Sequence, residues 1–343
     1  KAYFYATQAL TWEIVMGYRT CDDNNSKTFL NTYNGIKPGK YVTGNNSTML
    51  NEYKKAYDEI EKKVALHYTR PSALSETSAV AQKNPISMTY DWSTQKYTAT
   101  FTIENEYMDK SSPSNYREII HDLGKNGAGF DVSYTEGSKN TKITVSAKKA
   151  FKEVKTVTVN RRIQDIPDDM KVKTYLKYGN QTLIQGTSRP DIYGGSISFK
   201  ITDQPNIKVE KQYKTADGEL LTGVELDSAL ADTQFRIRKT IGGVKNYVAA
   251  DYDSANERYV FSHFTTDPAA ATAFHTVKTS GTKGTFAVLD LPSKKNASVS
   301  YALEEISSAA GYGTASATFS VPPYTDNKTQ TIKIVNNGAD YGT

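Results

Sequence analysis

Apolar residues in the first 84 positions recur at the spacing of an α-helix. One apolar stripe consists of Leu50, Tyr53, Tyr57, Ile60 and Val64. Charged residues occupy the rest of each turn, so the pattern predicts an amphipathic helix that Ser47 or Thr48 caps and Pro71 ends. The segment Phe4–Met16 predicts an earlier helix, and the polar stretch 21–47 reads as a long loop.

From Pro85 onward the apolar period changes to two, which is typical of β-strands. Alternating segments lie at 86–90, 97–103, 143–145 and 154–159. Residues 202–205 form a compact linker, and short strands separated by glycine-containing turns resume at Asn206. We therefore expect a mainly β, multidomain chain with domains at 1–84, 85–205 and 206–343, the last two being immunoglobulin-like β-sandwiches.

Composition indicates a folded chain and argues against a membrane-spanning helix. The 343 residues exceed one typical domain, and 11% aromatic residues argue against disorder. No run approaches the 18 or so apolar residues of a membrane helix. No leader opens the sequence, so we expect either that the protein is not exported or that a leader has been removed.

Charge, Cys and His content and glycine motifs give no support for a nucleic-acid partner or for a cofactor. The net charge of +5 is dispersed along the chain, so we expect no nucleic-acid partner. One Cys and four His without metal-ligand spacing predict neither a disulfide framework nor a metal site. Since no nucleotide-binding glycine motif occurs either, we expect no cofactor.

Three polar residues in the third domain are in phase with the apolar positions of their strands. Lys211 follows Ile207 and Val209, Glu305 follows Tyr301 and Leu303, and Asn336 follows Ile332 and Ile334. Alternation places each on the inward face of its strand. A Lys, a Glu and an Asn are therefore expected to meet in one core.

This trio can form a covalent bond. A desolvated Lys becomes a neutral nucleophile, and a desolvated Glu can hold a proton for the Asn side-chain carbonyl. The amine of Lys211 then displaces ammonia from Asn336, and proximity replaces a cofactor. The alternative from periodicity alone is that Lys211 snorkels at a strand end, Glu305 lies at the rim and Asn336 begins a turn.

The third domain resembles the CnaB or SpaA-type domains of Gram-positive surface proteins and pilins. The matching segments are Gly284–Pro292, Tyr301–Glu305 and Gly311–Tyr312. The resemblance implies an autocatalytic isopeptide bond between Lys211 and Asn336, with Glu305 as the catalytic acid. Ser308-Ala-Ala departs from the Ala-Pro that the family usually has before its acidic residue and Gly-Tyr.

The amino-terminal segment Ala6-Thr-Gln8-Ala-Leu-Thr-Trp12 resembles the TQxA signature of thioester domains in bacterial adhesins. The resemblance implies a partial α+β domain in which Gln8 condenses with a Cys thiol to give an electrophile for host amines. The family's Cys lies upstream of the Gln, so residue 1 is expected to be a truncation point. Cys21 is the disfavoured alternative partner, and Gln8 is otherwise an ordinary helix amide.

These resemblances imply a fragment of a Gram-positive surface or pilus-associated adhesin, located at the cell wall, that modifies itself but is not an enzyme with turnover. Its implied partners are a host surface or matrix protein and, as an option, pilus backbone subunits, with no membrane insertion. The middle domain resembles the sandwich that follows thioester domains, and a second crosslink there stays open. The alternative is a purely structural stalk or pilin segment without a reactive head. A secreted hydrolase is disfavoured because no catalytic triad or carboxylate pair emerges.

Overall fold

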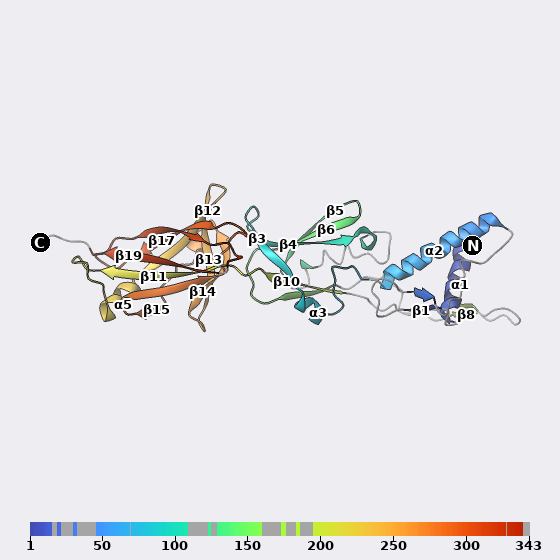
Figure 1. Ribbon diagram of the computed structural model, residues 1–343, viewed down its shortest axis with the longest axis horizontal. Helices are drawn as coiled ribbons and strands as arrows, with labels where there is room; N and C mark the ends of the chain where they lie inside the picture. Colours follow the sequence, from blue (N-terminus) through green and yellow to red (C-terminus); the bar gives the residue numbers. More distant parts are fainter. Residues whose placement is uncertain are drawn as a thin grey trace. The chain divides into compact units, whose positions relative to one another are not determined.

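The computed structural model of the chain is mainly β, with its helices concentrated in the first third (Figure 1). The residues that it describes are 1–15, 19–21, 30–32, 46–68, 70–108, 123–124, 129–159, 173–175, 183–185, 195–326 and 328–338. The chain forms two compact units. The first contains Lys1–Ile86, Thr100–Val145 and Val154–Phe199, and the second contains Ser87–Ala99, Ser146–Glu153 and Lys200–Thr343. The mainly β, multidomain fold is confirmed, and the three-domain division stays a prediction.

Both predicted amino-terminal helices are present in the first unit. Helix α1 is Ala2–Val15 and α2 is Ser47–Tyr68. They pack through a buried cluster of Ala6, Leu10, Tyr53, Ala56 and Tyr57. The predicted stripe thus faces α1, although the side chain of Val64 lies outside the described residues. The residue that caps α2 is Asn46 rather than Ser47 or Thr48, because the Asn46 side chain accepts a hydrogen bond from the Met49 N–H at 2.9 Å.

Part of the stretch expected to be a loop forms a short antiparallel pair. Strand β1 is Arg19–Cys21 and β2 is Leu30–Thr32, with Cys21 opposite Leu30. A second small pair joins β8, Lys173–Tyr175, to β9, Leu183–Gln185. Strands β1 and β2 were missed because three residues are too few to show a period.

A six-stranded sheet has the order β5-β6-β4-β3-β10-β7. Its strands are β3 (Ile86–Asp91), β4 (Lys96–Glu104), β5 (Asp131–Glu136), β6 (Asn140–Ala147), β7 (Lys155–Val159) and β10 (Gly195–Ile201). Burial alternates along β6, where Thr141, Ile143 and Val145 are buried. Helix α3, Ser78–Lys83, and the 3₁₀ turn η2, Asn105–Tyr107, complete this region. The predicted strands at 86–90, 97–103, 143–145 and 154–159 are confirmed, except that Val154 precedes β7.

The remaining strands form a larger sheet in the order β18-β17-β12-β13-β14-β16-β11-β19, with β15 beside β16. The strands are β11 (Asn206–Lys214), β12 (Gln234–Ile241), β13 (Val244–Asp253), β14 (Arg258–Thr265), β15 (Lys278–Ser280), β16 (Lys283–Leu289), β17 (Val299–Ser307), β18 (Ser316–Val321) and β19 (Thr329–Asn337). Helix α5 is Gly223–Ala231 and the 3₁₀ turn η4 is Pro268–Ala270.

This sheet folds back on itself into two facing layers. Strands β14 and β16 share only the pairs Tyr259–Val288 and Val260–Leu289, so the sheet can turn there. Aromatic rings fill the space between the layers: Phe286 of β16 lies 5.5 Å from Phe235 of β12 between ring centroids. Strands β11 and β17, separated by four strands in the sheet, therefore face each other across a dry interior.

Candidate functional site

Lys211 and Asn336 lie on neighbouring strands with their side chains on the same face. Strands β11 and β19 run parallel, with Lys211 opposite Ile334 and Tyr213 opposite Asn336. Lys211 and Asn336 are therefore diagonal neighbours, two positions apart in register, within reach of long side chains. Both are buried, at 0% and 4% relative exposure. The alternatives of a snorkelling Lys211 and a turn-forming Asn336 are excluded.

Glu305 reaches this pair from the opposite layer. On β17, Tyr301, Leu303 and Glu305 are buried, whereas Glu304 pairs with Arg238 on the other face. The carboxylate Oε1 of Glu305 lies 2.9 Å from Lys211 Nζ, and both side chains are fully buried. The structure thus brings together all three residues that strand alternation placed inside. Glu305 is a core residue, not the rim residue of the alternative interpretation.

The amide of Asn336 is fixed by three acceptors. Its Nδ2 donates to Glu305 Oε2 at 2.8 Å, to Ser308 Oγ at 2.9 Å and to the Gly313 carbonyl at 2.8 Å. Its Oδ1 is buried and has no hydrogen-bond partner among the described residues. The sequence expectation placed Glu305 against the amide oxygen, whereas the structure places it against the nitrogen, which is the leaving group of an amide exchange.

A ring of groups that the sequence interpretation did not name positions Glu305. The Ala315 N–H donates to Glu305 Oε2 at 2.7 Å. The Tyr213 hydroxyl lies 3.4 Å from Oε1 and contacts Thr233 Oγ1 at 2.6 Å and Ser308 Oγ at 3.1 Å. Tyr213 has the same strand phase as Lys211, so alternation could have found it. Thr233, Ser308 and Ala315 lie outside regular alternation and could not be found that way.

Burial controls the charge of Lys211. Loss of solvent lowers the pKa of Lys211 to about 8, and the Glu305 carboxylate partly opposes this by favouring the ammonium. The Nζ lies 4.3 Å from the centroid of the Tyr213 ring, whose π face also favours the charged form. Nζ contacts Glu305 at ion-pair distance without a well-directed hydrogen bond. A neutral amine is therefore accessible near physiological pH.

This shift predicts the pH dependence of a chain that cannot crosslink. In an Asn336→Leu chain Lys211 stays a free amine, whose folded pKa of about 8 lies below the ordinary 10.5. Between these values the unfolded state binds more protons than the folded state, so the free energy of unfolding should rise with pH. Urea unfolding at several pH values across this window measures the rise.

The matched control is the Lys211→Met, Asn336→Leu chain, which lacks the titrating amine. Trp92 lies in the second unit and packs against Tyr90 and Phe264, so its fluorescence reports on that unit in a Trp12→Phe background. Equal pH slopes in the two chains would show that Lys211 keeps its ordinary pKa in the folded state.

The residues of the proposed thioester lie in the first unit. Gln8 is half-buried in the middle of α1. Cys21 ends β1, and its side chain lies outside the described residues. The pairing of Gln8 with Cys21 or with an upstream Cys therefore stays a prediction.

Metal-ligand clusters and membrane-spanning helices are both absent from the described residues. No cluster of three or more His, Cys, Asp or Glu side chains is placed to hold a metal ion there. The helices of the same residues include none that is long and apolar enough to span a membrane.

No protein-family model and no curated protein matches the chain. Similar solved structures include the Bacillus anthracis TIE protein, with 10% identity, a TM-score of 0.25, and coverage of 98% of this chain and 50% of that one. A streptococcal ancillary pilin has 16% identity and a TM-score of 0.25, and the match covers 71% and 62% of the two chains. The shaft pilin SpaA of Lactobacillus rhamnosus GG has 13% identity and a TM-score of 0.29, and the match covers 71% of this chain and 84% of that one. The chain spans half the length of the first structure and less than two thirds of the second, and TM-scores this low carry no functional argument.

Proposed function

We propose that this chain is part of a Gram-positive cell-surface or pilus-associated adhesin whose last domain crosslinks itself. The observation that carries the proposal is the buried contact of one carboxyl group, Glu305, with both Lys211 Nζ and Asn336 Nδ2. Such a bond resists pulling and needs no oxidant, which suits a stalk on a cell surface. The measurement that tests it is the mass of the intact chain, which the crosslink lowers by one ammonia.

The proposed reaction uses the two oxygens of Glu305 as a proton relay. Oε1 accepts a proton from the Lys211 ammonium across 2.9 Å, which leaves a neutral amine beside a neutral carboxylic acid. The amine attacks Asn336 Cγ and forms the new N–C bond. Rotation of the carboxyl group then carries this proton from the Lys211 side to the Asn336 side, where the carboxyl oxygen lies 2.8 Å from Nδ2. Protonation of Nδ2 breaks the C–Nδ2 bond, and ammonia leaves. A second proton of the former ammonium then returns to Glu305, and one proton remains on the new amide nitrogen.

The dry interior favours this reaction in two ways. Excluding water removes competing hydrolysis of the Asn336 amide, and the fixed register of β11 and β19 supplies orientation that a bimolecular reaction lacks. A buried ion pair has a high desolvation cost. Conversion of Lys211 to a neutral amide and of Glu305 to a neutral acid removes both charges, which gives the reaction a driving force.

The proposed head function is covalent host attachment through Gln8 in a thioester with a Cys of a longer chain. Its support is the TQxA-like segment around Gln8 on α1. The second candidate, a structural stalk or pilin segment without a reactive head, is favoured by the Lys211–Glu305–Asn336 site alone, since that site needs no ligand. A host surface or matrix protein is the proposed partner only in the first case, and both cases place the chain at the cell surface.

Methylamine distinguishes these two candidates. If the head is reactive, a chain extended by its natural upstream sequence should gain methylamine at Gln8, and the 343-residue chain should not. Peptide mapping locates the adduct, and Gln8→Ala in the extended chain is the control. An extended chain that gains no methylamine supports the structural segment, and an adduct in the shorter chain implicates Cys21.

A further inference from the structure

The nitrogen of the Asn336 side chain is surrounded by more hydrogen-bond acceptors than an amide can use. Its three acceptors are Glu305 Oε2 at 2.8 Å, Ser308 Oγ at 2.9 Å and the Gly313 carbonyl at 2.8 Å. A side-chain amide nitrogen carries only two protons. One of the three acceptors is therefore surplus while Asn336 is an intact amide.

The oxygen of the same amide has the opposite environment. Asn336 Oδ1 is buried and has no hydrogen-bond partner among the described residues. Acyl-transfer sites commonly place N–H donors where negative charge develops on the carbonyl oxygen, and the described part of this chain supplies none to Oδ1. The site is thus arranged around the nitrogen that leaves rather than around the oxygen that stays.

A chain of hydroxyl groups that runs in one direction makes Ser308 an acceptor. The Ala229 carbonyl can only accept, so the Thr233 hydroxyl donates to it at 2.7 Å. Thr233 Oγ1 then accepts the Tyr213 proton at 2.6 Å, which is the shortest contact of the Tyr213 hydroxyl. The Tyr213 oxygen accepts the Ser308 proton at 3.1 Å. The Ser308 oxygen is left to accept from Asn336 Nδ2.

The segment that carries these acceptors is held in place by its neighbours. Residues 308–315 link β17 to β18, and Gly311 has a φ of 84°, which lets the chain reverse there. Tyr312 packs edge to face on Tyr213, with 4.6 Å between the ring centroids, and forms a β-bridge with Gly338 after β19. The acceptors are therefore fixed before the reaction begins, as electrostatic catalysis requires.

We propose that Ser308 and the Gly313 carbonyl are catalytic groups that bind the leaving ammonia, a role that rests on the crosslinking reaction proposed above. In the tetrahedral intermediate, a proton from Glu305 gives Nδ2 three N–H bonds, and the resulting carboxylate oxygen is free to accept one of them. Three donors then match three acceptors. The C–Nδ2 electron pair leaves with the nitrogen as ammonia, and an electron pair of the former amide oxygen restores the C=O bond. Because the third hydrogen bond exists only after protonation, it stabilises the departing group more than the intact amide.

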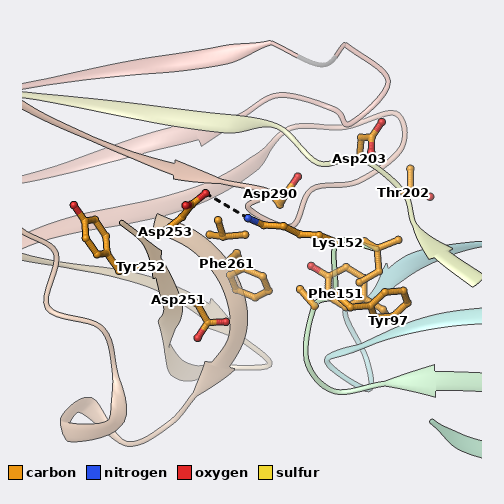
Figure 2. Close-up of a pocket in the computed structure, with 13 residues that line it drawn as sticks. Tyr97, Phe151, Lys152, Thr202, Asp203, Asp251, Tyr252, Asp253, Phe261 and Asp290 are labelled. Carbon is orange, nitrogen blue, oxygen red and sulfur yellow. Dashed lines mark ion pairs between the residues drawn. The ribbon is translucent and has the colours of Figure 1, made fainter. Parts of the chain in front are cut away.

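The pocket in Figure 2 is separate from this arrangement. Its volume is about 520 Å³, and none of its lining residues belongs to the reactive site or to residues 308–315. By contrast, Gly311 and Gly313 are exposed, and the Gly313 carbonyl contacts Nδ2 directly. The departing ammonia therefore has to pass only this segment to reach solvent.

Time-resolved intact mass of the full chain tests the role of Ser308. The chain is pulse-labelled during cell-free synthesis and chased at 4 °C, and acid-quenched samples give the fraction that has lost about 17 Da. Ser308→Ala should slow this loss about ten- to a hundredfold, the effect of one hydrogen bond to a developing positive charge. Ser308→Thr keeps the hydroxyl and should stay within about threefold of the native rate.

Ser307→Ala is the matched control for the change at Ser308. It removes a hydroxyl from the preceding residue, which donates to the Asp232 carbonyl at 2.7 Å and not to the Asn336 amide. The rate of ammonia loss should therefore equal that of the native chain.

Thermal unfolding after the reaction is complete separates catalysis from structure. Crosslinked Ser308→Ala should unfold within about 5 °C of the crosslinked native chain, because the contact to Nδ2 has gone from both. A slow Ser308→Ala chain that also unfolds at a much lower temperature would show a merely structural role. If Ser308→Ala does not fold, Ser308→Cys takes its place, because its sulfur is only a weak acceptor.

Failure of this proposal and failure of the crosslink give different results. A native chain that never loses ammonia overturns the crosslink and the role of Ser308 together. If the native chain does lose ammonia, a Ser308→Ala chain that reacts at the native rate overturns the role of Ser308 alone. A Ser308→Thr chain as slow as Ser308→Ala does the same, since the hydroxyl would then not be what the reaction needs.

Discussion

Intact mass spectrometry is expected to give the chain a mass about 17 Da below the value calculated from its sequence, because amide formation releases one ammonia. Glu305→Gln should restore the full calculated mass, since the glutamine keeps the shape of the side chain but cannot relay a proton from Lys211. Lys211→Met and Asn336→Leu should restore it as well, because each removes one reactant. Fragmentation should then find a branched peptide that joins β11 to β19 in the native chain and in none of these three variants.

Glu304→Gln is the matched control for this result. It makes the same chemical change one residue away on β17, where Glu304 pairs with Arg238 instead of facing the interior. This variant should keep the deficit of about 17 Da, because it leaves the Glu305 relay intact. A native chain with its full calculated mass would rule out the crosslink, and a Glu305→Gln chain that still lacks ammonia would remove Glu305 from the reaction.

The inward placement of the three reactive residues could be predicted because strand alternation is a local property. Lys211, Glu305 and Asn336 each continue an apolar series with a period of two. Burial follows that period on β17 and β19 and, apart from Glu210, on β11. The convergence of these strands could not be read from the same pattern. It depends on the parallel register of β11 with β19 and on the turn of the sheet between β14 and β16.

The groups around the reactive residues were missed for a different reason. Helix α5 has only nine residues, and most of its contribution is tertiary: Leu226 and Leu230 pack with Tyr213 and cover the core beside the site. Ser308 and Gly313 act from the segment after β17, where no periodicity applies. These acceptors together decide whether the oxygen or the nitrogen of the Asn336 amide faces Glu305. The orientation of the amide therefore cannot be predicted from the sequence.

Loss of the crosslink is expected to destabilise the second unit strongly. A bond between Lys211 and Asn336 closes a loop of about 125 residues, and the chain-entropy relation for disulfides assigns this about 5 kcal/mol. Glu305→Ala also leaves the Lys211 charge buried without a partner, which costs about 3–5 kcal/mol more. Thermal unfolding followed by Trp92 fluorescence in a Trp12→Phe background should therefore shift down by more than about 15 °C.

The double variant Lys211→Met, Glu305→Leu separates these two contributions. It removes the crosslink as well as the buried charges and fills the space with apolar side chains, so only the loss of about 5 kcal/mol from loop closure should remain. Its unfolding temperature should therefore lie between those of the native chain and Glu305→Ala. A Glu305→Ala chain that unfolds at the native temperature would mean that neither the bond nor the ion pair stabilises the fold. Equal unfolding temperatures for the two variants would assign the whole loss to the crosslink, because an unpaired Lys211 would then cost nothing.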